Sequence, residues 1–385
     1  MRVLYLSQGR KAEDHPGYHD AMQRLSREGV TSFYHNLPYI GFAEEHGFDA
    51  LWAEIIRQAR AYEVDSVYFQ YFHRKANESP LRCIEALRAL PSRPTIAVSC
   101  GDAYSANWMW PHFPESFKIC ALLSDIVFST HMGRTADLMI KWGAKNIVLL
   151  PHALCQIRFQ AHANLVIEAD KEFDVVWVGS RRVPKPNVWN RVFWNGRRRV
   201  SVVSALSKRY GARFGLFGHQ WDGWPSWQGP VPFCEQQNTF RRGRLVVDAL
   251  PDPFGDHYYA SDRPFFELAS GTPVILFEKP GLDRLFKRGV HAHFVSTVDG
   301  LLNTCDRLSA IDPQVLQTQA AQAAAWIAAR HTQYERMKFA METVKLFRGA
   351  KIHNRKAAAP CPPYFLPEVD LEREMQYAVR GWVGE

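Results

Sequence analysis

Short, wholly apolar runs alternate with amphipathic segments along the 385-residue chain, and this alternation limits the fold more than any other feature. A run that is apolar on both faces predicts a strand of a parallel sheet, because helices cover both sides of such a sheet. In the first part of the chain these runs are RVLYLSQ, SVYFQYF, TIAVSC, IVFST and NIVLLP. The segments between them read as helices over 18–29, 48–63, 81–90 and 134–144. The sequence therefore predicts a doubly wound α/β domain.

The pattern blurs over 152–172 and restarts at FDVVWVGS, which predicts a second domain of the same kind. Its expected strands are DVVWVGS, RFGLFG, RLVVDAL, TPVILFE and HAHFVS, with helices near 196–210, 262–270, 281–288, 315–330 and 335–347. We expect two Rossmann-like domains over 1–160 and 161–350 that face a central cleft, and a tail over 351–385 that packs back on the first domain. In such sheets ligands bind at the carboxyl ends of the strands.

Composition narrows the functional classes. A net charge of +8 favours anionic partners such as nucleotides, nucleic acid or membrane surfaces. Seven cysteines without a CxxC pair suggest neither a zinc cluster nor a disulfide framework. We find no signal peptide and no transmembrane segment, so we expect a soluble cytoplasmic protein, in the host cytoplasm if it is viral. The absence of GxGxxG and GxxxxGK[ST] argues against hydride transfer and ATP hydrolysis.

The stretch HYYASDRPFFELASGTPVILFE, residues 257–278, carries the most specific chemistry. Ser261 and Asp262 are good N-cap residues for a helix that Gly271 ends. Free amides at a helix start and the Arg263 guanidinium attract phosphate. Glu267, one turn further on, could accept hydrogen bonds from both hydroxyls of a ribose. Together they predict a nucleoside diphosphate site, although an exposed Arg263–Glu267 pair is the alternative for an isolated helix.

The order Ser-x-Arg-(x)3-Glu-(x)3-Gly-x-Pro-Val resembles the donor-binding motif of GT-B glycosyltransferases, in particular the spore-maturation-protein-like family and the glycosyl transferases group 1. Further segments are similar to parts of these enzymes in the same order: LLPHA (149–153), FDVVWVGS (173–180), RFGLFGHQW (213–221) and HTQYERM (331–337). The resemblance covers roughly residues 95–345. It implies a hexosyltransferase that needs no metal and no cofactor other than a nucleotide sugar, with UDP the expected nucleotide.

The resemblance also implies roles for individual residues. Donor contacts would come from Gly17, Gly179, Ser180, Arg181, His219, Ser261, Asp262, Arg263 and Glu267. His19, after the first strand, and Asp102, after TIAVSC, are the candidates for a general base if the enzyme inverts. Asp102 is as readily a turn or cap carboxylate. Related retaining enzymes often carry a second glutamate where this chain has Tyr259, so the stereochemical outcome stays open.

A basic run, RRVPKPNVWNRVFWNGRRR at 181–199, holds seven Lys and Arg, two Trp and no acid. Basic residues interleaved with aromatics suit a nucleic-acid backbone with exposed bases. The expected acceptor contacts are Arg182, Lys185, Trp189, Arg191, Trp194, Arg197, Arg198 and Arg199. This run makes double-stranded DNA carrying 5-hydroxymethylpyrimidine the leading acceptor, as in phage-type DNA glycosyltransferases.

Other interpretations remain open from the sequence. The run could serve a cell-surface glycan or a small molecule, or it could be a solvated basic face. A sugar-nucleotide-binding module without catalysis and a nucleotide-sugar epimerase would use the same architecture.

Overall fold

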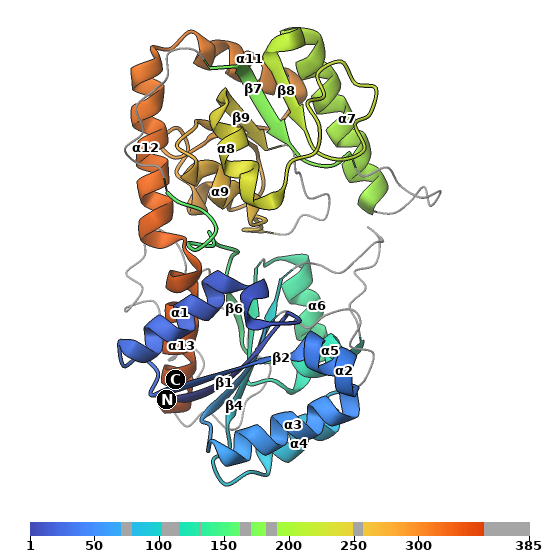
Figure 1. Cartoon of the computed structure of the whole chain (residues 1–385), viewed down its shortest axis with the longest axis vertical. Helices are drawn as coiled ribbons and strands as arrows, with labels where there is room; N and C mark the ends of the chain where they lie inside the picture. The colour runs from blue at the N-terminus through green and yellow to red at the C-terminus, as the bar shows by residue number, and fades with distance from the viewer. Residues whose placement is uncertain are drawn as a thin grey trace. The chain divides into compact units, whose positions relative to one another are not determined.

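The computed structural model describes residues 1–70, 79–101, 115–130, 132–161, 171–181, 191–248 and 257–349, with the backbone alone over 191–195. The described chain divides into two units. Unit 1 comprises the residues up to Pro151 and those from Gln333 onward, and unit 2 runs from His152 to Thr332. Each unit is built around its own parallel sheet (Figure 1).

The sheet of unit 1 has the strand order β2-β1-β3-β4-β5-β6, with every neighbouring pair parallel. Its strands are β1 (Arg2–Ser7), β2 (Phe33–Pro38), β3 (Ser66–Phe69), β4 (Thr95–Cys100), β5 (Ile126–Ser129) and β6 (Ile147–Leu149). Its helices are α1 (Pro16–Arg27), α2 (Tyr39–His46), α3 (Phe48–Ala61), α4 (Leu81–Arg88), α5 (Glu115–Leu123), α6 (Arg134–Trp142) and α13 (Gln333–Gly349), and a 3₁₀ turn, η1 (Ala12–Asp14), precedes α1.

Helix α13 belongs to unit 1, although the predicted boundaries place it in the second domain. Its apolar side chains join those of α1 and of one face of the sheet in a single buried cluster. Polar contacts also hold the helix in place. The Tyr334 hydroxyl donates to the Glu28 carboxylate, Arg336 Nε donates to the Pro151 carbonyl at 2.8 Å, and Arg348 pairs with Asp65 at 3.0 Å. The chain thus enters unit 2 at His152 and returns at Gln333, while the predicted tail 351–385 lies outside the described residues.

The sheet of unit 2 has the strand order β11-β10-β9-β7-β8, again all parallel. Its strands are β7 (Phe173–Val178), β8 (Phe214–Phe217), β9 (Gly243–Asp248), β10 (Val274–Phe277) and β11 (His293–Val295). Its helices are α7 (Arg191–Tyr210), α8 (Gln236–Arg241), α9 (Arg263–Ala269), α10 (Leu282–Leu285), α11 (Val298–Ser309) and α12 (Pro313–Arg330), with 3₁₀ turns η2 (Gly211–Arg213) and η3 (Phe233–Glu235).

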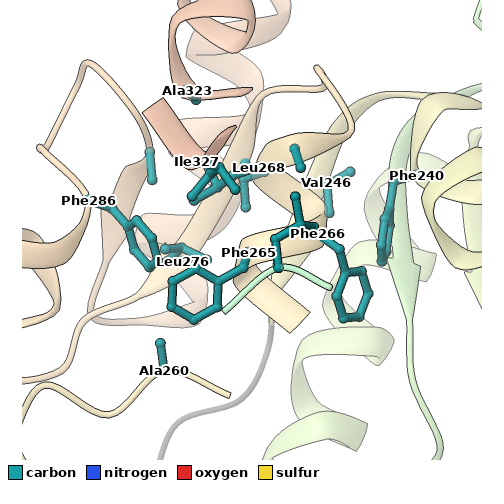
Figure 2. Close-up of a cluster of buried hydrophobic side chains, with 14 of the residues drawn as sticks. Phe240, Val246, Ala260, Phe265, Phe266, Leu268, Leu276, Phe286, Ala323 and Ile327 are labelled. Carbon is teal, nitrogen blue, oxygen red and sulfur yellow. The ribbon is translucent and has the colours of Figure 1, made fainter. Parts of the chain in front are cut away.

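Alternation along the strands of unit 2 builds two separate hydrophobic layers. Val176 and Val178 of β7 join a cluster with α8, α9 and α12, whereas Val175 and Trp177 join a cluster with α7 and α11. Figure 2 shows the first layer, in which Phe265 of α9 lies close to Phe286 and Ile327. Helix α9, which carries the predicted donor residues, is therefore anchored in the core, and every side chain from Pro264 to Ala269 is buried.

Candidate functional site

The topology of unit 2 singles out one point on its sheet. Strand β7 pairs with β8 on one side and β9 on the other, so the chain reverses its direction of winding between β7 and β9. Ligands in open α/β sheets bind outside the carboxyl ends of the strands at such a switch point. Here β7 leads into Gly179 and β9 ends on Asp248, which is 6% exposed. The fold alone therefore places a candidate site beside these two residues.

The turn that follows β7 has no room for side chains. Gly179 N–H donates to the Phe217 carbonyl at 2.8 Å. A Cβ on Gly179 would lie 3.1 Å from Arg263 Nη1, and a Cβ on Gly218 would lie 2.3 Å from the Gly179 carbonyl oxygen. Because both positions are glycine, the ends of β7 and β8 and the Arg263 side chain can approach one another closely. A ligand at this place would contact the peptide groups of the turn directly.

Arg263 and Glu267 bring unused polar atoms to this point. Glu267 is 1% exposed, and neither of its carboxylate oxygens has a hydrogen-bond partner among the described residues. Arg263 Nη1 is also buried without a hydrogen-bond partner there. Arg263 and Glu267 therefore do not form the exposed i,i+4 pair that the sequence left open as the alternative. Buried polar groups are normally hydrogen-bonded, so this arrangement points to a ligand that completes it.

The electrostatics of the cluster follow from its burial. Burial raises the pKa of the Glu267 carboxyl well above its ordinary value, and the nearby Asp248 carboxylate raises it further. Arg263 acts in the opposite direction, and Asp262 adds a smaller upward contribution. The free site thus holds Glu267 toward its neutral form. Hydroxyl groups that donate to both oxygens would favour the ionised form instead.

The start of α9 differs in detail from the prediction. Asp262 takes the N-cap position, but its side chain makes no capping hydrogen bond, and the helix has seven residues. Gly271 follows the helix with φ 74°, the left-handed conformation expected where a glycine ends a helix. Since so short a helix offers little dipole, the argument for phosphate binding depends on Arg263 and the Gly179 turn.

The segment that leads into α9 is held against the loop after β10. Tyr258 has φ 63°, and its backbone N–H donates to the Pro280 carbonyl at 2.8 Å. The Lys279 ammonium lies 4.7 Å from the centre of the Tyr259 ring. Tyr259 thus places an aromatic ring with a cation over it where related retaining enzymes often carry a glutamate.

The basic run divides into parts with different surroundings. Arg182, Lys185 and Trp189 lie outside the described residues, and so do the side chains of Arg191 and Trp194. Arg197 and Arg198 are exposed on α7, but Arg199 is 2% exposed and donates from Nη1 to the Ser180 carbonyl. A buried guanidinium cannot line a polymer surface, so the structure removes Arg199 from the predicted acceptor contacts.

Two other predicted donor residues lie beside the turn. The half-buried Arg181 donates its backbone N–H to the His219 carbonyl at 3.0 Å, and its guanidinium lies 5.9 Å from the centre of the Trp224 ring. The His219 side chain is exposed. Both residues therefore lie at the carboxyl end of the sheet of unit 2, together with Ser180.

In unit 1 two of the predicted site residues lie in the first turn of a helix. Gly17 and His19 lie in α1, with Gly17 buried. His19 Nδ1 lies 2.8 Å from the Tyr34 hydroxyl, and its Nε2 lies 2.9 Å from the Gln23 side-chain nitrogen. Both ring nitrogens are thus engaged within unit 1. Asp102, the other candidate base, lies outside the described residues.

The switch point of unit 1 holds two buried polar side chains that the sequence analysis missed. Between β1 and β3 the winding reverses, and Ser7 and Gln70 stand at the ends of these strands, 3% and 1% exposed. Gln70 Oε1 accepts a hydrogen bond from the Gln8 backbone N–H at 3.2 Å. The Nε2 donors of the Gln70 side chain therefore point away from Gln8. Neither Gln70 Nε2 nor Ser7 Oγ has a partner among the described residues. Only the position of Gln70, directly after an apolar strand, could have pointed to it.

The described residues lack two features. They contain no group of three or more His, Cys, Asp and Glu side chains that could hold a metal ion. No helix in the described part of the chain is long and apolar enough to cross a membrane.

Comparison with known proteins adds the family context. Residues 197–342, which include Arg263 and Glu267, match the family model described as glycosyl transferase-like. The comparison with curated protein sequences finds no significant match.

Solved structures resemble most of the chain. HepE of Anabaena in complex with UDP and glucose has a TM-score of 0.54 at 16% identity, and the alignment covers 90% of this chain and 99% of HepE. Sucrose-phosphate synthase of Thermosynechococcus elongatus has a TM-score of 0.55 at 13% identity, with 91% and 100% covered. Trehalose 6-phosphate synthase of Burkholderia multivorans has a TM-score of 0.57 at 11% identity, with 91% and 99% covered. The predicted fold and the general glycosyltransferase class are confirmed: the chain has the GT-B fold, and residues 197–342 match a glycosyl transferase-like domain.

Proposed function

We propose that the protein transfers a hexose from a UDP-sugar to a hydroxyl acceptor and that unit 2 binds the UDP at the β7/β9 switch point. The observation that carries the proposal is the buried Glu267 carboxylate, whose two oxygens have no partner among the described residues, close to Arg263 and the Gly179 turn. A ribose offers two adjacent hydroxyl donors to such a carboxylate. Arg263 and the backbone amides of the turn then bind the diphosphate.

Neighbouring structures support the choice of nucleotide. HepE of Anabaena has been solved with UDP, with UDP and glucose, and with UDP-glucose. Its likeness covers 90% of this chain and 99% of HepE.

The proposed transfer forms one bond at the anomeric carbon of the hexose and breaks another. The acceptor oxygen forms a bond to the anomeric carbon, and the bond from that carbon to the β-phosphate oxygen breaks. UDP leaves with the electron pair, and Arg263 and Arg181 stabilise its charge without a metal ion. A general base takes the acceptor proton, and Asp102 and His19 stay the candidates for it. His19 can serve only if Nε2 separates from Gln23, which lies 2.9 Å away.

The acceptor is a separate part of the proposal. Arg197 and Arg198 expose two positive charges on α7, and 5-hydroxymethylpyrimidine in DNA stays the first acceptor to test. Glycans and small hydroxyl compounds are the alternatives. In unit 1, the Gln70 amide donors and the Ser7 hydroxyl, which lack partners within the described ranges, suit an oxygen-rich acceptor.

The proposed activity is tested by incubating the protein with a panel of UDP-sugars and acceptors in the presence of EDTA. Free UDP and the mass of the acceptor are measured in parallel. The proposal expects UDP release coupled to a hexose-sized mass gain, with about a tenfold or larger loss in a Glu267→Ala variant. A binding module would release no UDP, and an epimerase would form a new UDP-sugar without any acceptor.

A further inference from the structure

Two buried side chains brace the turn after β7 and have no role yet in donor binding. They are Trp221, which is fully buried, and Arg199 of α7. We infer that Trp221 and Arg199 are positioning residues that aim the Ser180 amide N–H at a phosphate oxygen of the donor. The inference rests on the proposed function, because it assigns this amide to the diphosphate.

Trp221 fixes the first peptide group of the turn. Its indole Nε1 donates to the Gly179 carbonyl at 2.7 Å. The ring is held edge-on between Trp177 and Trp224, with ring centres 5.4 and 5.1 Å away and interplanar angles of 86°. A ring packed on both sides cannot turn away without opening the core. The Gly179 carbonyl is therefore locked toward the indole.

Arg199 fixes the next peptide group. Its Nη1 donates to the Ser180 carbonyl. Burying a guanidinium that is 2% exposed costs free energy, which favours a position where the charge contributes to binding. So close to the turn, that positive charge would also attract a phosphate group.

The geometry of the peptide bond turns the Trp221 contact into an orientation, while the Arg199 contact holds the peptide group that follows. In a trans peptide the carbonyl and the following N–H point in opposite directions, and the described chain has no cis peptide bond. With the Gly179 carbonyl held by Trp221, the Ser180 N–H must point away from the indole. The next amide, of Arg181, is already used by the His219 carbonyl at 3.0 Å, whereas the Ser180 N–H has no hydrogen-bond partner in the described chain. The turn thus leaves one amide donor for a phosphate oxygen.

The test compares UDP with uridine, which has the same base and ribose but no phosphate. Trp221→Phe keeps an aromatic ring and removes the indole donor. The matched control is Trp227→Phe, which removes a similar indole bond of 2.9 Å to the Gly218 carbonyl and none to the turn. We expect Trp221→Phe to weaken UDP about tenfold and to leave uridine affinity unchanged, while Trp227→Phe changes neither. Arg199→Met should lower the UDP-to-uridine selectivity in the same way.

The outcomes separate this inference from the function on which it rests. If the wild-type protein binds neither ligand, the proposed function fails. If the wild type prefers UDP but folded Trp221→Phe and Arg199→Met variants keep the full preference, the turn needs no bracing and the inference is overturned. Thermal melts identify folded variants, and Arg199→Met alone decides the question if Trp221→Phe does not fold.

Discussion

Replacing Glu267 by glutamine tests the electrostatics of the nucleotide site while keeping its shape. The carboxyl is 1% exposed, and burial together with Asp248 raises its pKa well above the ordinary 4.5. The folded protein therefore binds more protons than the unfolded chain between 4.5 and the raised value. The free energy of unfolding must fall as the pH rises through this window. One proton gives a slope of about 1.4 kcal/mol per pH unit, and the E267Q variant lacks that proton.

The expected result is that E267Q gains stability over the wild type as the pH rises. Urea denaturation of the ligand-free proteins from about pH 5 to about pH 8 measures the difference at each pH. Glu235→Gln, which changes an exposed carboxylate of the same unit, is the matched control. A flat difference for E267Q would mean that Glu267 is not held toward its neutral form, and the electrostatic reasoning would be refuted.

Three further predictions concern the same site and the joint between α1 and α13. Gly218→Ala should destabilise the protein by about 3 kcal/mol in urea denaturation, because φ is 126° and the new Cβ would lie 2.3 Å from the Gly179 oxygen; a neutral effect would contradict the packing. Tyr334→Phe removes the hydrogen bond that contributes most to lowering the pKa of Glu28. The variant should therefore unfold with a lower free energy than the wild type, and this difference should narrow as the pH falls below 4.5 and Glu28 takes up a proton. A difference that stays constant would rule out that contact. UDP binding should release a proton as Glu267 ionises, which calorimetry in buffers of different ionisation enthalpy measures; binding without proton release would contradict the ribose assignment.

Much of the fold could be predicted because strands of a parallel sheet that are buried on both faces appear in the sequence as apolar runs. Strands such as TIAVSC and DVVWVGS were expected within a residue or two of their observed bounds. The strand Phe33–Pro38 was missed since it lies at the edge of its sheet, where only Leu37 is fully buried and polar residues interrupt the pattern. The helix Glu115–Leu123 was missed because it follows directly on a stretch without periodicity.

The site could be predicted only where one short segment carried it. Arg263 and Glu267 lie four residues apart, so their proximity is local and visible in the sequence. Asp248 joins them through the strand order β10-β9-β7, which no local pattern reveals. Arg199 was misassigned because a basic run looks like a surface, and only packing shows which of its members is buried.

The central claim is that unit 2 binds UDP through Arg263 and Glu267. Isothermal titration of UDP into the wild type, Arg263→Ala and Arg284→Ala tests it most directly, since Arg284 is an exposed arginine on the short helix α10 of the same unit. The account predicts that the wild type and Arg284→Ala bind UDP alike, whereas Arg263→Ala binds it about ten- to a hundredfold more weakly. Equal UDP affinity in all three proteins, or no binding to the wild type, would contradict it.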